Sequence, residues 1–158
     1  DTIFDLTDSI SNRNVNQGLS SLHNILSDGE APIKINALIT RQIRLMVQAK
    51  LVLKKNAINF DARRITYQDF VSRFFQPLSK KMAGDLPKTT TVNLLKQNPY
   101  VAYKIIQKII RFEEEELIGF LEKTLEADIQ LKSNSVPAEY ILEQLVYDLC
   151  RPPRRKAI

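Results

Sequence analysis

The segment that decides the fold is APIKINALITRQIRLMVQAKLVLKKN, residues 31–56. After Pro32 it contains no further Gly or Pro, and its apolar residues recur every three or four positions, which predicts one long α-helix. Pro32 suits the first turn, where its missing amide would have no intrahelical partner. The apolar stripe comprises Ile35, Leu38, Ile39, Ile43, Met46, Ala49 and Leu53. We expect this helix to be the spine of the domain.

Two shorter helices are predicted before the spine. The first covers residues 3–11, with Phe4 and Ile10 among its apolar positions. One face of the second carries Val15, Leu19, Leu22, Ile25 and Leu26. Gly29 follows where a left-handed C-cap is expected.

Residues 56–91 are less regular. Thr66 is a candidate cap for a helix in which Phe70, Phe74, Leu78 and Met82 recur at four-residue intervals. Pro77 should kink or split that helix. Residues 84–91 (GDLPKTTT) form a loop by composition, and TVNLLKQ suggests a short helix.

Three helices are predicted in the C-terminal part. Asn98 and Pro99 open the first as N-cap and first-turn proline, and four glutamates favour the next helix start at residue 113. The predicted buried stripe of that helix is Leu117, Ile118, Leu121, Leu125 and Ile129. Ser135 is a candidate cap for the last helix, whose inward residues are Ile141, Leu142, Leu145, Val146 and Leu149. The fold class is therefore all-α, a single helical-bundle domain of about seven helices over residues 1–150, with an irregular insertion at 56–91 and a flexible basic tail at 151–158.

The composition is that of a globular protein without extracellular features. The chain has 158 residues, 44% of them hydrophobic and 26% charged. Its single cysteine allows no internal disulfide, which favours a cytoplasmic location. No apolar run approaches the roughly 20 residues needed to cross a membrane. The chain does not begin with Met, and we expect it to be part of a longer protein.

The net charge of +5 is unevenly distributed. Residues 32–111 carry sixteen basic and three acidic residues, whereas residues 112–150 carry ten acidic and two basic ones. Two interpretations stay open: helices of opposite charge neutralise each other within one bundle, or the basic part binds a partner or nucleic acid. The candidate subunit or DNA contact surface is formed by Lys34, Arg41, Arg44, Lys55, Lys104, Lys108 and Arg111.

The residue types needed for catalysis are sparse. His23 is the only histidine and is predicted to be a half-exposed helix residue, and Cys150 a small buried apolar one. No Gly-rich phosphate-binding loop is present. The sequence therefore predicts no catalytic, cofactor-binding or metal-binding residues, and we expect no enzymatic activity.

Five segments in order resemble a known family: residues 3–10, 19–50, 98–112, 125–133 and 142–150. Together they are similar to the C-terminal domain of the delta subunit of bacterial DNA polymerase III. The resemblance implies a collar domain of the sliding-clamp loader, which takes part in DNA replication. It implies oligomerisation with delta-prime and the ATPase subunits in a five-membered ring, and DNA binding only through the assembled complex.

In that family an N-terminal module, which this chain lacks, grips the sliding clamp. Two features depart from the family pattern. Residues 56–91 are longer than the usual connection, so Phe74 and Phe75 are candidate contacts of an added surface helix. Glu113 stands where the family commonly has a serine cap. The alternative to an assembly domain is a basic all-α module that binds nucleic acid.

Overall fold

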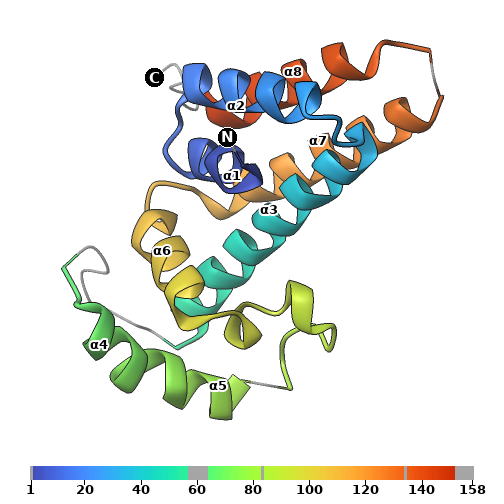
Figure 1. Ribbon diagram of the computed structural model, residues 1–158. Coiled ribbons are helices and arrows are strands. Elements are labelled where there is room, and N and C mark those ends of the chain that lie inside the picture. The colour runs from blue at the N-terminus through green and yellow to red at the C-terminus, as the bar shows by residue number, and fades with distance from the viewer. Residues whose placement is uncertain (1, 57–63, 83, 134, 152–158) are drawn as a thin grey trace, which may run out of the picture. The chain divides into compact units, whose positions relative to one another are not determined.

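The computed structural model describes residues 2–56, 64–82, 84–133 and 135–151 (Figure 1). All regular elements in these ranges are helical, which confirms the all-α prediction. The α-helices are α1 (Ile3–Ser11), α2 (Val15–Ser27), α3 (Pro32–Lys55), α4 (Tyr67–Phe70), α5 (Gln76–Met82), α6 (Pro99–Ile109), α7 (Glu114–Ser133) and α8 (Ala138–Cys150). A π-helical segment (Val71–Phe75) joins α4 to α5, and two 3₁₀ turns (Thr90–Val92, Leu94–Lys96) precede α6. With α4 to α5 taken as one continuous helix, the predicted number of about seven helices is confirmed.

The chain divides into two compact units. The first comprises residues 1–43 and 118–158, and the second comprises residues 44–117. The predicted tail falls at residues 152–158, outside the described residues, as do residues 57–63 of the predicted insertion. Among the described residues, no helix is both long and apolar enough to cross a bilayer.

In the first unit, α1, α2 and α8 pack against one another (Figure 1). All five inward residues predicted for α8 are buried, as are Leu6, Ile10, Leu22 and Ile25 of α1 and α2. Phe4 was expected among the apolar positions of the first helix, but its side chain is 69% exposed. The other described part of this unit pairs the start of α3 with α7, where Asn36 Nδ2 donates to the Thr124 carbonyl over 3.1 Å.

The buried face of α7 differs from the predicted one. Leu117 is buried as expected, but Ile118, Leu125 and Ile129 are 45%, 61% and 60% exposed. Beside Leu117, the inward positions of this helix are Phe120, Thr124, Ala127 and Leu131. Two apolar stripes share this helix, and the buried one carries the large ring of Phe120 and Thr124, whose carbonyl accepts the hydrogen bond from Asn36.

In the second unit, a π turn shifts the register of the helix from α4 to α5. Gln76 donates its amide to the Val71 carbonyl, five residues back, immediately before Pro77. A proline has no amide to donate to the carbonyl of the fourth preceding residue, and the proline ring clashes with that carbonyl. The wider π turn therefore accommodates Pro77 without ending the helix. Of the predicted stripe, Phe70, Leu78 and Met82 are buried as expected. The prediction for Phe74 is wrong, because the π turn brings Phe75 inward, at 8% exposed, and leaves Phe74 half-buried.

Capping residues were predicted well in three places and wrongly in one. Thr66 accepts the Asp69 amide, Asn98 accepts the Tyr100 amide, and Gly29 has a φ of +92°. Ser135 does not cap α8, because that helix begins at Ala138 with Pro137 before it. A proline at the helix entrance fixes the start downstream of the serine.

Candidate functional site

The seven basic residues proposed as a contact surface are divided between the two units. Lys34 and Arg41 lie on α3 in the first unit. The second unit holds the other five, namely Arg44, Lys55, Lys104, Lys108 and Arg111. On the surface, Lys34 Nζ lies 3.3 Å from Glu30 Oε2, and Lys55 Nζ lies 3.2 Å from Asp85 Oδ2. Local acidic partners thus offset part of this charge, and a shared basic surface stays a prediction.

The two phenylalanines proposed as insertion contacts have different environments. Phe75 is buried, and its ring centroid lies 6.0 Å from that of Phe70. Phe75 is therefore a packing residue of the second unit, and its proposed role as a surface contact is wrong. Phe74 remains half-buried and stays a candidate contact.

Three apolar side chains of α7 form an exposed surface in the first unit. Ile118, Leu125 and Ile129, hereafter the α7 stripe, are spaced by seven and four residues, so they lie along one side of the helix. Single exposed apolar residues are common on proteins, but several on one helix face are typical of an interaction surface. The exposed acidic residues Glu122 and Glu126 lie on the same helix beside it.

A tyrosine cluster lies in the second unit, which the sequence did not indicate. The ring of Tyr67 is 5.6 Å from that of Tyr100 and 5.5 Å from that of Tyr103, in edge-to-face geometry. The Tyr103 hydroxyl donates to the Ile65 carbonyl over 2.7 Å, which anchors the cluster. Tyr100 is 54% exposed, and Lys104 Nζ lies 5.9 Å from its ring centroid. Tyr100 thus presents an exposed ring with the Lys104 ammonium over one of its faces.

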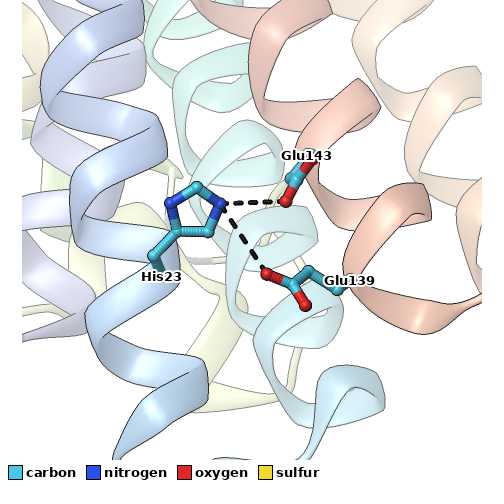
Figure 2. Close-up of side chains that lie close together, drawn as sticks. All are labelled: His23, Glu139 and Glu143. Atoms are coloured by element: carbon cyan, nitrogen blue, oxygen red, sulfur yellow. Dashed lines mark hydrogen bonds and ion pairs between the residues drawn. The ribbon is translucent and has the colours of Figure 1, made fainter.

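His23 of α2 faces two glutamates of α8, as Figure 2 shows. Its Nε2 lies 2.9 Å from Glu143 Oε1 and 3.9 Å from Glu139 Oε1. The side chains of His23, Glu139 and Glu143 are 48%, 64% and 38% exposed. His23 was predicted to be half-exposed, which is confirmed, but its two partners are more than 110 residues away and left no local signal in the sequence.

Cys150 is confirmed as a buried apolar residue. Its side chain is fully buried, and burial raises the pKa of the thiol to about 11. Ser9 Oγ lies 3.8 Å from the sulfur, a weak contact whose effect on this pKa is smaller and opposite. A buried protonated thiol is unreactive, so Cys150 has no features of a nucleophile.

Two comparisons with known proteins agree with one another. The family model described as DNA polymerase III delta subunit, C-terminal domain, matches residues 1–68 and 78–149. The chain is 26% identical over 149 residues to DNA polymerase III subunit delta of Bacillus subtilis (strain 168). This alignment covers 94% of the chain but 35% of the relative, so the chain spans about a third of that protein's length.

No solved structure matches the chain. The family match leaves out residues 69–77, the segment that contains the π turn, Phe74 and Phe75. The unusual part of the second unit therefore coincides with the interruption in the family pattern.

Proposed function

Because the chain belongs to the family formed by the C-terminal domain of the DNA polymerase III delta subunit, we propose that it is the assembly domain of a clamp-loader delta subunit. In this role it is not catalytic. It joins delta-prime and the ATPase subunits in the ring that loads the sliding clamp during replication in the cytoplasm. The clamp itself is contacted by an N-terminal module of the subunit, and DNA through the assembled complex.

The observation that carries this proposal is the family match, which covers nearly all of both units. The absence of a phosphate-binding loop from the sequence is compatible with it, because an assembly domain needs no nucleotide site. The exposed apolar residues of the last two helices support it further. They comprise Ile118, Leu125 and Ile129 on α7 and Tyr140 and Tyr147 on α8, all at least 45% exposed.

We assign the contact with a neighbouring loader subunit to the α7 stripe. Apolar side chains and tyrosines are enriched at the centre of protein interfaces, where burying them supplies most of the binding energy. Glu122 and Glu126 beside the stripe favour a partner surface with lysine or arginine at its rim, because such pairing speeds and orients association.

The test is calorimetric titration of the chain with delta-prime and with the ATPase subunits of the same organism. The double variant Leu125→Asp/Ile129→Asp should bind its partner at least about tenfold more weakly, because two charges would be buried without partners. Ile110→Asp is the matched control, because Ile110 is also an exposed apolar residue, at 57%, but lies in the second unit. This variant should bind the loader subunit as tightly as the parent does. Circular dichroism would verify that all three proteins are folded.

If the chain binds none of the loader subunits, alone or in a reconstituted mixture, the assembly role is wrong. If the double variant binds as tightly as the parent, the role stands and the interface lies elsewhere.

Direct contact with nucleic acid is a second candidate function, favoured by the tyrosine cluster of the second unit. Stacking of bases on an exposed tyrosine next to a cation stabilises the complex of a protein with single-stranded nucleic acid, without sequence preference. Tyr100 is 54% exposed and Lys104 is next to it. DNA affinity should then fall steeply with salt and be lost on charge reversal of Arg41, Arg44, Lys104 and Lys108. Salt-insensitive or absent binding would exclude it.

A further inference from the structure

We propose that His23, Glu139 and Glu143, hereafter the His23 cluster, bind a divalent transition-metal ion, with Zn²⁺ as the best match. The three residues bring together one imidazole nitrogen and two carboxylates, and these donor types are among those that bind zinc in proteins. The proposal concerns a face of the first unit and does not depend on the assembly function.

The geometry of the donor atoms is close to that of a metal site. One donor atom from each of the three residues lies within 4.8 Å of the others. Around a tetrahedral zinc ion with bonds of about 2.0–2.2 Å, two donor atoms are about 3.3–3.5 Å apart. The observed separations of 2.9 Å and 3.9 Å from His23 Nε2 lie on either side of that value. Rotation of the partly exposed glutamate side chains would convert one arrangement into the other.

The helices that carry the ligands are held together by direct packing. Glu139 and Glu143 are four residues apart, and neighbours at this spacing lie on the same side of a helix, so both carboxylates of α8 can face α2. A Cβ atom at Gly18 of α2 would lie 2.8 Å from Val146 Cγ1 of α8, which shows how closely these helices approach. The rigid part of the site is therefore the helix pair, and only side-chain ends need to move on binding.

The local charge favours a cation. Within the described part of the chain, His23 is the only basic group paired with either Glu139 or Glu143. With a neutral imidazole, which is the form that binds a metal, the cluster carries two negative charges, and a divalent ion balances them. Imidazole selects Zn²⁺, Co²⁺, Ni²⁺ or Cu²⁺ over Mg²⁺ and Ca²⁺, which prefer oxygen ligands.

The site is open on one side. A hollow of about 220 Å³ adjoins it, lined by Leu19, His23, Tyr140, Glu143, Gln144 and Tyr147. Three protein ligands leave the fourth position of a tetrahedral ion free, and this hollow provides room for water or for a donor atom of a partner. Because all three ligands are partly exposed, we expect micromolar affinity, well below that of a buried structural zinc site.

The test can use an NMR signal that is assigned without ambiguity. His23 is the only histidine, so any imidazole signal in an NMR spectrum belongs to it. Titration of the chain with ZnCl₂ should shift these resonances and saturate at one ion per chain in calorimetry. Thermal denaturation should give a melting temperature that rises with zinc concentration, because the ion binds the folded helix pair and not the unfolded chain. Mg²⁺ at the same concentration should produce neither effect.

Three variants separate this site from other surface carboxylates. His23→Gln and Glu143→Gln should each weaken zinc binding at least about tenfold and abolish the rise in melting temperature. Glu115→Gln removes an exposed carboxylate from α7 and should change neither the zinc affinity nor the rise in melting temperature. All three substitutions are at partly or fully exposed positions, so they should leave the fold intact.

The proposal is overturned if zinc leaves the imidazole resonances of His23 unchanged. It is also overturned if the chain binds zinc but His23→Gln and Glu143→Gln bind it within twofold of the parent, because the ion would then occupy unrelated carboxylates. In either case, His23 and Glu143 would form a surface hydrogen-bonded pair and nothing more.

Discussion

The backbone of Gly18 in α2 lies directly against the side chain of Val146 in α8. A Cβ atom at Gly18 would be 2.8 Å from Val146 Cγ1, 2.9 Å from Ser9 Oγ and 3.1 Å from Cys150 Sγ. Since the three neighbours come from α1 and α8, this glycine is the point where three helices of the first unit meet. A side chain of any size at this position would push them apart.

Gly18→Ala should therefore destabilise the protein in spite of the better helix propensity of alanine. Overpacking of a tight core costs about 1–3 kcal/mol, which exceeds the roughly 1 kcal/mol that alanine contributes within a helix. Urea denaturation followed by circular dichroism would measure the difference in the free energy of unfolding.

Gly119→Ala is the matched control, because a Cβ atom there meets nothing within 4 Å. Only helix propensity acts at this position of α7, so this variant should be more stable by about 0.5–1 kcal/mol. If both alanine variants were stabilised, the close packing at Gly18 would be incorrect.

Gln48 of α3 holds the irregular segment before α6 through both ends of its amide. Its Nε2 donates to the Val92 carbonyl over 2.6 Å, and its Oε1 accepts the Leu94 amide over 2.8 Å. Gln48→Ala should cost about 2–3 kcal/mol, because removing the side chain leaves backbone groups of a buried turn without partners. Gln42→Ala, on the same helix but half-buried, should change the free energy of unfolding by less than about 0.5 kcal/mol. Similar values for the two variants would contradict this role of Gln48.

The π turn before Pro77 determines which of two adjacent phenylalanines contributes more to stability. The structure and the four-residue sequence pattern give opposite answers. Phe75 is 8% exposed and contacts Phe70, whereas Phe74 is half-buried. Phe75→Ala should cost about 3 kcal/mol as a large-to-small change in the core, and Phe74→Ala less than half of that. In a regular α-helix with the four-residue spacing, Phe74→Ala would be the more destabilising of the two substitutions. Thermal denaturation of both variants therefore distinguishes the helix with the π turn from a regular helix.

Local chemistry explains why much of the fold was predictable. Three features all depend on residues within one or two turns of each other: the helix α3 from Pro32 to Lys55, the Asn98 cap with Pro99, and the left-handed Gly29. Such preferences act before any tertiary contact forms, and the sequence displays them directly.

The errors arose where the outcome depends on distant residues. Two apolar stripes compete on α7, and a contact from Asn36, 88 positions away, lies on the chosen side. The register shift at Pro77 needs the packing of Phe75 to decide where the extra residue is absorbed. The His23 cluster depends on residues more than 110 positions apart, so no local pattern could indicate it.

Cys150 should make the stability of the protein fall at alkaline pH. Burial raises the pKa of its thiol from 9.0 to about 11. Below pH 9 the thiol is protonated in both the folded and the unfolded chain, and its full contribution to stability is present. Between pH 9 and 11 the unfolded chain loses this proton while the folded chain retains it, so the free energy of unfolding falls by about 1 kcal/mol per pH unit.

Comparison with Cys150→Ala isolates this effect, because every other ionisable group is common to both proteins. Urea denaturation at pH 7, 8.5 and 10 should show that the stability of the parent relative to the variant is nearly equal at the first two pH values and lower by about 1 kcal/mol at pH 10. A constant difference across the series would mean that the thiol ionises equally readily in both states. The buried packing of Cys150 beside Ser9 would then have to be revised.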